Sequence, residues 1–103
     1  MHSAAELLHR LRAAAAAGDT PAQALARVGQ PPWIDSRRAG DRAALDMADF
    51  APDAEAPQDF ADPHGAAQVI YWGLPGTSGA PIAGLLWDAA GAPRLFRAQV
   101  LPP

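Results

Sequence analysis

Two segments in the last third of the chain place large apolar side chains at consecutive positions, residues 69–72 (VIYW) and residues 85–87 (LLW). The first is dense in β-branched and aromatic residues, which favour strands. Successive side chains of a strand point to opposite faces of the sheet, so these segments put large apolar groups on both faces. Any fold of this chain therefore has to cover both faces of a sheet.

Three strands are predicted, over residues 68–74, 82–88 and 95–101, with turn-forming residues (PGTSGAP and AAGAP) between them. Because both connections are short, consecutive strands should be antiparallel neighbours in a meander. The last strand alternates, with Phe96, Ala98 and Val100 on one side and Arg97 and Gln99 on the other. This alternation predicts a half-buried edge strand.

The N-terminal third predicts two helices in a hairpin. Ser3 and Glu6 have the spacing of a capping box, and Gly18 is a typical residue to end the helix that follows. Thr20 begins a second helix, with Pro21 at its first position. The first helix carries an apolar stripe at i, i+3, i+4 and i+7, formed by Ala4, Leu7, Leu8, Leu11, Ala14 and Ala15.

The middle of the chain is acidic. Residues 35–67 hold eight acids and three arginines, a net charge of −5, while the segments on either side are each close to neutral. A short helix is predicted over residues 41–49, and the proline-rich residues 51–65 are expected to form a loop or a mobile segment. The fold class is thus α+β in a single small domain, 1–103. A helical hairpin (1–34) packs on a three-stranded antiparallel β-meander (68–103), and an acidic Pro/Ala-rich connector (35–67) joins them.

Composition excludes several classes of function. The chain has no cysteine, so disulfides, thiolate metal sites and cysteine nucleophiles are ruled out. A net charge of −3 argues against broad attraction to nucleic acid or to anionic membranes. All eight basic residues are arginine and 26 residues are alanine, which indicates a GC-rich, bacterial coding sequence. No stretch approaches the roughly 20 apolar residues of a membrane span, so we expect a cytoplasmic protein.

The sequence offers few groups for catalysis. Residues 76–81 (GTSGAP) are similar to the stretch around the nucleophile of chymotrypsin-like serine proteases, but Thr77 and Ala80 depart from that pattern and the chain is too short for the fold. The groups His2/Glu6/His9 and Asp59/Asp62/His64 lack the spacing of a known metal site. We therefore expect no enzyme, no cofactor and no metal, with a small-ligand site or an enzyme subunit as an alternative.

A second alternative is DNA binding. Residues 18–29 (GDTPAQALARVG) resemble the second helix of helix-turn-helix domains. That resemblance implies a following reader helix, for which Arg37, Arg38 and Arg42 are the candidate DNA contacts. Two consecutive prolines interrupt the connection to such a helix, which favours a plain two-helix packing unit.

The favoured function follows from the surplus of apolar side chains. Two short, alanine-rich helices can cover one face of the sheet, which leaves the other face, or the edge of the last strand, for a partner. Tyrosine, tryptophan and arginine are the usual anchors of such interfaces, so the predicted partner-binding residues are Tyr71, Trp72, Trp87 and Arg97. The partner would be another protein or a second copy of the chain, and the acidic connector would meet a basic surface on it.

Overall fold

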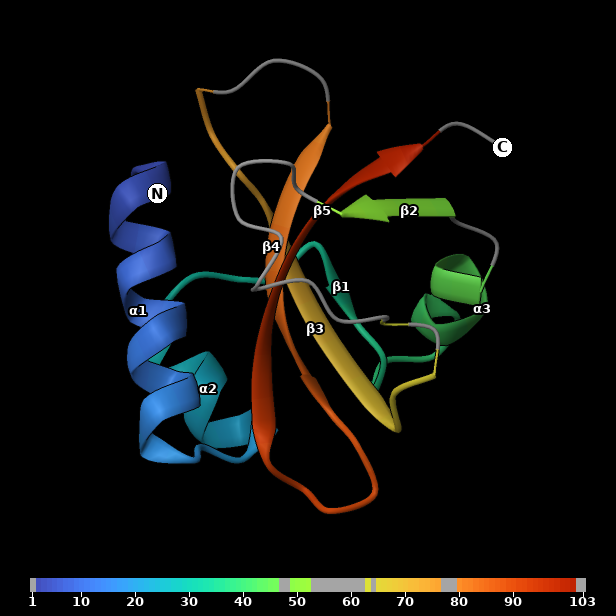
Figure 1. Cartoon of the computed structure of the whole chain (residues 1–103), viewed down its shortest axis with the longest axis horizontal. Coiled ribbons are helices and arrows are strands. Elements are labelled where there is room, and N and C mark those ends of the chain that lie inside the picture. The colour runs from blue at the N-terminus through green and yellow to red at the C-terminus, as the bar shows by residue number, and fades with distance from the viewer. Residues whose placement is uncertain (1, 47–48, 53–62, 64, 77–79, 102–103) are drawn as a thin grey trace.

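The computed structural model describes residues 2–46, 49–52, 63, 65–76 and 80–101. In these residues an N-terminal helical region packs against an antiparallel sheet, which confirms the α+β class (Figure 1). The sheet has five strands rather than the three predicted, in the order β1-β3-β4-β5-β2. The two additional strands lie at its edges.

The helical hairpin has the predicted bounds. Helix α1 (Ala4–Ala17) begins after Ser3, whose Oγ accepts the N–H of Glu6 at 3.2 Å, and it ends at Gly18 in the left-handed conformation. The Glu6 carboxylate does not complete the capping box, because it pairs with Arg10 one turn later at 2.8 Å. Helix α2 (Pro21–Val28) has the full reciprocal capping box.

The predicted meander is present as β3 (Gln68–Gly73), β4 (Pro81–Trp87) and β5 (Pro93–Leu101), each antiparallel to the next. Strand β1 (Ile34–Asp35) pairs with β3, and β2 (Asp49–Pro52) pairs with the end of β5. The prediction of β5 as an edge strand is therefore wrong, since a segment from the connector covers it. Helix α3 (Asp41–Asp46) lies between β1 and β2 in the chain, within the range predicted for a short helix.

One face of the sheet packs against α1 and α2. The buried residues of this layer come from the predicted stripe of α1, from α2, from alternate positions of β3 and β4, and from the residue that follows β3. They are Leu7, Leu11, Ala14, Ala24, Val28, Ile70, Trp72, Leu74, Ala83, Leu85 and Trp87. At about 25 cal/mol per Å² of apolar surface, this layer supplies much of the driving force for folding.

The opposite face is also buried, so the prediction of an uncovered face is wrong. Its core contains Ala66, Val69, Tyr71, Ile82, Leu86, Phe96 and Ala98, with Ile34 and Phe50 packed against them. The last two residues come from β1 and β2, the strands that the sequence did not predict. Widening the sheet by these two strands adds apolar side chains at both margins of this second core.

Gly84 makes room for the centre of the second core. It lies opposite Tyr71 on the neighbouring strand, and a Cβ at this position would lie 2.3 Å from the carbonyl oxygen of Ile70 and 2.5 Å from the Cβ of Tyr71. No other residue fits there without moving the backbone. The Tyr71 ring also meets Phe50 and Phe96 edge to face, with ring centroids 6.0 and 6.4 Å away.

Candidate docking surface

The predicted partner-binding aromatic residues are inside the protein. Tyr71, Trp72 and Trp87 are 5%, 1% and 3% exposed. They cannot anchor a partner on the surface of the folded chain, so this prediction of their exposure is wrong. The fourth predicted residue, Arg97, is half-buried on β5, between Phe96 and Ala98 of the second core. By strand alternation its side chain leaves the sheet on the other face, the one that α1 and α2 cover.

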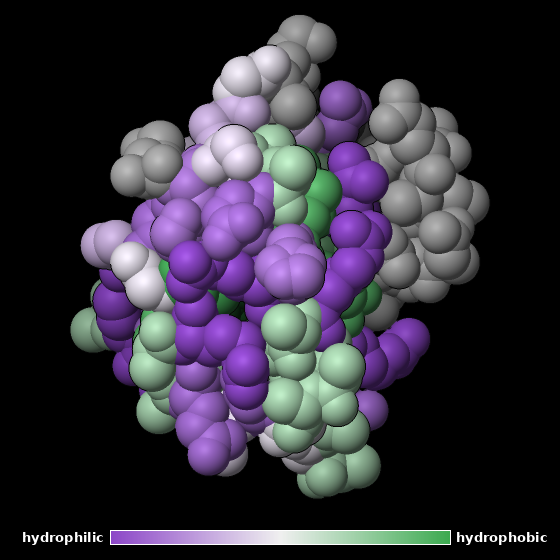
Figure 2. All heavy atoms as spheres, turned by 90° about the vertical axis from the view of Figure 1, so that its left-hand side faces the viewer, coloured by the Kyte–Doolittle hydropathy of each residue, from purple (hydrophilic) through white to green (hydrophobic). Residues whose placement is uncertain are grey.

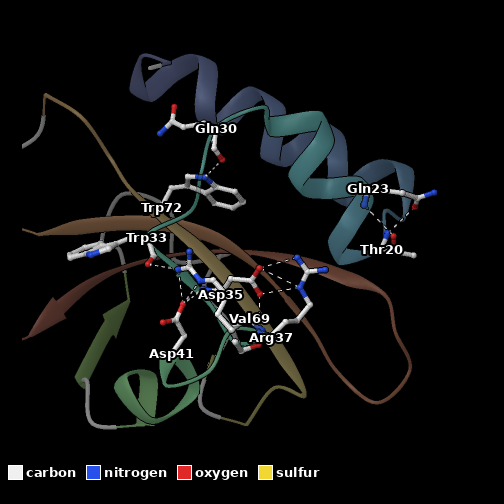
Figure 3. A network of polar contacts seen from close by, with 11 residues as sticks. Thr20, Gln23, Gln30, Trp33, Asp35, Arg37, Asp41, Val69 and Trp72 are labelled. Carbon is white, nitrogen blue, oxygen red and sulfur yellow. Dashed lines mark hydrogen bonds and ion pairs between the residues drawn. The ribbon is translucent and has the colours of Figure 1, made fainter.

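The two buried tryptophans have a structural role instead. The Trp87 indole donates from Nε1 to the carbonyl oxygen of Asp19 at 2.9 Å, just before α2 begins. The Trp72 indole donates to the carbonyl oxygen of Gln30 at 3.0 Å, just after α2 ends (Figure 3). Both ends of α2 are thus fixed to the sheet, with each polar indole N–H satisfied.

The outer side of the helices offers no broad apolar area in the residues described. Figure 2 faces α1 and shows a surface that is mainly hydrophilic, with strongly hydrophobic atoms visible only in small areas. The exposed positions here are small or charged residues such as Ala5, Arg12 and Ala16. This side of the molecule therefore lacks the anchors of a typical protein interface.

Trp33 is the exposed large hydrophobic residue of the described chain, with 56% of its surface open to solvent. It follows Pro31 and Pro32 and immediately precedes β1. Its N–H donates to the carbonyl oxygen of Tyr71 at 2.9 Å, and its own carbonyl accepts from Nη2 of Arg38 at 2.9 Å. The backbone of this exposed residue is therefore held on both sides.

The Trp33 ring contacts the protein on one side and is exposed to solvent on the other. It meets the ring of Tyr71 edge to face, with centroids 6.1 Å apart at 82°. A Cβ on Gly73 would lie 3.7 Å from Cε3 of the indole, so the ring lies on the glycine backbone. Figure 3 shows the indole pointing away from the neighbouring charged network, and its Nε1 has no hydrogen bond to the described residues. This donor is available to a ligand.

A network of charged side chains follows directly after Trp33. The Asp35 carboxylate accepts the N–H of Arg37 at 3.0 Å and three contacts from the Arg37 guanidinium, at 3.1, 3.3 and 2.9 Å (Figure 3). The Asp41 carboxylate accepts the N–H of Asp35 at 3.0 Å and Nε of Arg38 at 2.6 Å. Each carboxylate thus binds one backbone donor and one guanidinium.

These contacts keep both carboxyl groups ionised. Burial alone would raise the pKa of Asp35, but the hydrogen bonds and charge of Arg37 outweigh it and lower that pKa below the ordinary value of 3.8. The hydrogen bond from the Asp35 N–H lowers the pKa of Asp41. Burial, with the nearby Asp41 carboxylate, raises the pKa of Tyr71. The site therefore carries fixed charges near neutral pH.

The same network closes the outer edge of β1. The N–H groups of Trp33 and Ser36 donate to carbonyl oxygens of β3, whereas the N–H of Asp35 donates to the Asp41 carboxylate. On the inner side, Ser36 Oγ accepts the N–H of Val69 at 2.9 Å. A strand with its outward donor already bound is a poor template for an added strand. Docking by strand addition is therefore not favoured at β1.

A hollow lies at the N-terminal end of α2. It has a volume of about 280 Å³ and is lined by Thr20, Pro21, Ala67, Gln68, Trp87, Asp88 and Gly91. Several of its polar groups already have partners inside the protein: Thr20 caps α2, Trp87 donates to Asp19, and Asp88 accepts the N–H of Ala90. The hollow therefore has few free groups with which to orient a ligand.

The other sequence candidates lie partly outside the described residues. Residues 77–79, which carry the protease-like motif, and Asp59, Asp62 and His64 lie outside the described residues. Nε2 of His2 lies 2.7 Å from the carbonyl oxygen of Val28, so this ring nitrogen is engaged within the protein rather than with a metal. Among the residues described, no cluster of three or more His, Asp or Glu side chains is arranged to hold a metal.

The helix-turn-helix arrangement is not formed. Helices α1 and α2 pack on one side of the sheet, while α3 packs against β1 on the other side (Figure 1). Arg37, Arg38 and Arg42 are engaged with Asp35, Asp41 and the carbonyl oxygen of Ala66. The helix expected to read DNA is thus separated from the helix that should support it.

Trp33 is the residue that the sequence argument missed. It lies outside every periodic segment of the sequence, so no helix or strand pattern singles it out. The available signal is its position directly after two prolines, since a large aromatic residue in a rigid loop often has a binding role.

None of the helices in the described part of the chain has the length and apolar character to span a bilayer. Comparisons with protein-family models, with curated proteins and with solved structures find no match to this chain.

Proposed function

We propose that this chain is a non-enzymatic protein-binding module, of an accessory or regulatory kind, that engages its partner through the Trp33 surface. This surface consists of Trp33, Pro31, Pro32, Gly73 and Arg38. The observation that carries the proposal is an indole more than half exposed on a backbone fixed by two hydrogen bonds. The bacterial and cytoplasmic setting rests on composition and is part of the same proposal.

The energetics of the Trp33 surface support a docking role. Burying the exposed part of this indole stabilises a complex by about 2–4 kcal/mol at the usual value per area. That is the contribution of a typical interface hot spot. The two preceding prolines and the two backbone hydrogen bonds already restrict the chain at Trp33, so little backbone entropy is lost on binding.

A selection experiment tests the proposal without a known partner. A random peptide library displayed on phage is selected on the native protein and then counter-selected on the Trp33→Ala variant. The expected result is a set of peptides that bind the native protein and lose about tenfold or more in affinity on Trp33→Ala, which equals about 1.4 kcal/mol. Binding should also protect Trp33 from fluorescence quenching by iodide.

Two controls make the selection specific. Trp33→Ala should keep its melting temperature within a few degrees of the native value, because the side chain is largely outside the core. Arg94→Ala changes an exposed residue on β5 that contributes nothing to the Trp33 surface, and it should leave binding unchanged. The proposal would be overturned if every recovered peptide bound the native protein and Trp33→Ala equally well, or if no peptide were recovered.

A further inference from the structure

The charges beside Trp33 are paired, but they are unequally exposed. The Arg37 and Arg38 side chains are 37% and 48% exposed, whereas their partners Asp35 and Asp41 are 6% and 23% exposed. Each ion pair therefore turns its positive member toward solvent and its negative member toward the protein. A ligand approaching this edge of the sheet meets guanidinium groups before it meets carboxylates.

Both guanidinium groups retain donors. Arg37 uses Nε and Nη2 on Asp35, and Arg38 uses Nε on Asp41 and Nη2 on the carbonyl of Trp33. No hydrogen bond within the described residues involves Nη1 of either arginine. A guanidinium carries five N–H donors, so both can accept a further carboxylate without giving up their internal partners.

The Arg38 guanidinium connects the charged network to Trp33. Its Nη2 lies 2.9 Å from the Trp33 carbonyl oxygen, so the guanidinium lies next to the backbone of the residue that carries the exposed indole. The open Nε1–H of Trp33 adds a neutral donor to the Trp33 surface. An apolar platform, one indole donor and outward guanidinium groups together match a ligand that carries apolar groups, carbonyl oxygens and carboxylates.

We infer that the partner of the Trp33 surface is an acidic peptide segment, a conclusion that rests on the proposed function. An apolar or proline side chain of the segment packs on the Trp33 ring, and a main-chain carbonyl accepts from the indole. A neighbouring Asp or Glu of the segment pairs with Arg38, and a second acid pairs with Arg37 further along the edge. Charge-assisted hydrogen bonds of this kind fix register and speed association.

Single-stranded nucleic acid is the competing ligand, because bases stack on exposed aromatic rings and phosphates bind arginine. The small excess of positive charge argues against it. Residues 33–42 hold three arginines and two aspartates, and the whole chain has a net charge of −3. Affinity for nucleic acid depends on neutralising many phosphates, which this surface does not offer.

The test examines the peptides that the native protein selects in a Trp33-dependent way. Asp and Glu should be enriched in them and Lys and Arg depleted. For one selected peptide, replacing its acids by Asn or Gln should weaken binding about tenfold, and so should Arg38→Gln in the protein. Arg94→Gln, a matched loss of an exposed arginine elsewhere, should change nothing. Higher salt should weaken the interaction, as expected for exposed charge pairs.

The outcomes distinguish the docking function of the Trp33 surface from the acidic nature of its partner. If Trp33-dependent peptides are recovered but show no acidic preference and bind Arg38→Gln normally, the acidic partner is wrong and the docking function stands. If no Trp33-dependent peptide is recovered, both fail. Tight, Trp33-dependent binding of oligothymidine, or a Trp33-dependent dimer seen by light scattering, would overturn the acidic peptide in favour of nucleic acid or of a second copy.

Discussion

Trp33, Trp72 and Trp87 have the same side chain in three different environments. Trp72 and Trp87 lie on strands whose register turns them toward α2, where two carbonyl oxygens accept their indole N–H groups. Trp33 lies at the margin of the sheet, where its ring rests on the Gly73 backbone and more than half of it is exposed. The place of each residue relative to the sheet, rather than its hydrophobicity, decides whether a tryptophan is core or surface.

Gly84 gives the sharpest prediction for a single residue. In Gly84→Ala the new Cβ would lie 2.3 Å from the Ile70 carbonyl oxygen, so β3 and β4 must separate at the centre of the sheet. We expect a loss of about 3 kcal/mol or more in the free energy of unfolding, measured in urea. Gly73→Ala is the matched control, since its nearest neighbour is at 3.7 Å and it should change stability little. Equal effects of the two variants would contradict this account of Gly84.

Among the elements, α2 depends most on contacts with the sheet. It has only eight residues, fewer than an isolated helix needs in water. Its capping box satisfies the first turn, and an ion pair between Arg27 and Asp19, at 2.7 Å, closes the loop before it. The indoles of Trp72 and Trp87 hold the residues on either side of it.

Removing one indole hydrogen bond should loosen α2 more than the rest of the molecule. Trp87→Phe leaves the Asp19 carbonyl without its donor, and Trp72→Phe does the same at Gln30. We expect each variant to lose about 2–4 kcal/mol, from the hydrogen bond and the smaller ring. Amide hydrogen exchange should accelerate first in α2. Trp33→Phe is the control with no such bond, and unchanged exchange in α2 of both core variants would refute this role.

The sequence predicted those elements whose signals are local. The caps at Ser3, Thr20, Gly18 and Gly29 mark the ends of α1 and α2, and the dense apolar runs mark β3 and β4. Strands β1 and β2 have two and four residues, too few to show a period. They are strands because β3 and β5 offer free edges, which is a tertiary cause that no local pattern contains.

The error about the docking face has the same origin. The sequence correctly indicated apolar groups on both faces, but without β1 and β2 the second face lacked Ile34 and Phe50 at its margins. Tyr71 was therefore expected on the surface, although it packs over Gly84 in the second core. The exposed Trp33 was overlooked because its importance depends on where β1 ends the sheet.

At the scale of the whole molecule, two ion pairs combine a buried carboxylate with an exposed arginine. Asp19 pairs with Arg27 in the helical layer, and Asp35 pairs with Arg37 at the edge of the sheet. A buried carboxylate that loses its partner is costly, whereas an exposed pair such as Glu6–Arg10 contributes little. The acidic charge of the chain is therefore tied to its stability at two separate places.

These pairs predict how stability depends on pH. The hydrogen bond from Arg27 lowers the pKa of Asp19, and the contacts with Arg37 lower that of Asp35 despite its burial, both from an ordinary value of 3.8. A carboxyl group whose pKa is lower in the folded state stabilises the fold above its unfolded pKa. That stabilisation is lost as the pH falls through the folded value. We therefore expect the free energy of unfolding to be level near neutral pH and to fall steeply below about pH 4.

Asp35→Asn shows whether the buried pair causes this loss. At neutral pH it should cost about 1–3 kcal/mol, because an amide is a weaker partner for Arg37 than a carboxylate. Below the folded pKa of Asp35 the native protein carries a neutral carboxylic acid there, so the two stability curves should converge. Glu6→Gln, which changes the exposed pair, should follow the native curve over the whole range. Parallel curves for Asp35→Asn and the native protein in urea unfolding would assign the acid sensitivity to other carboxyl groups.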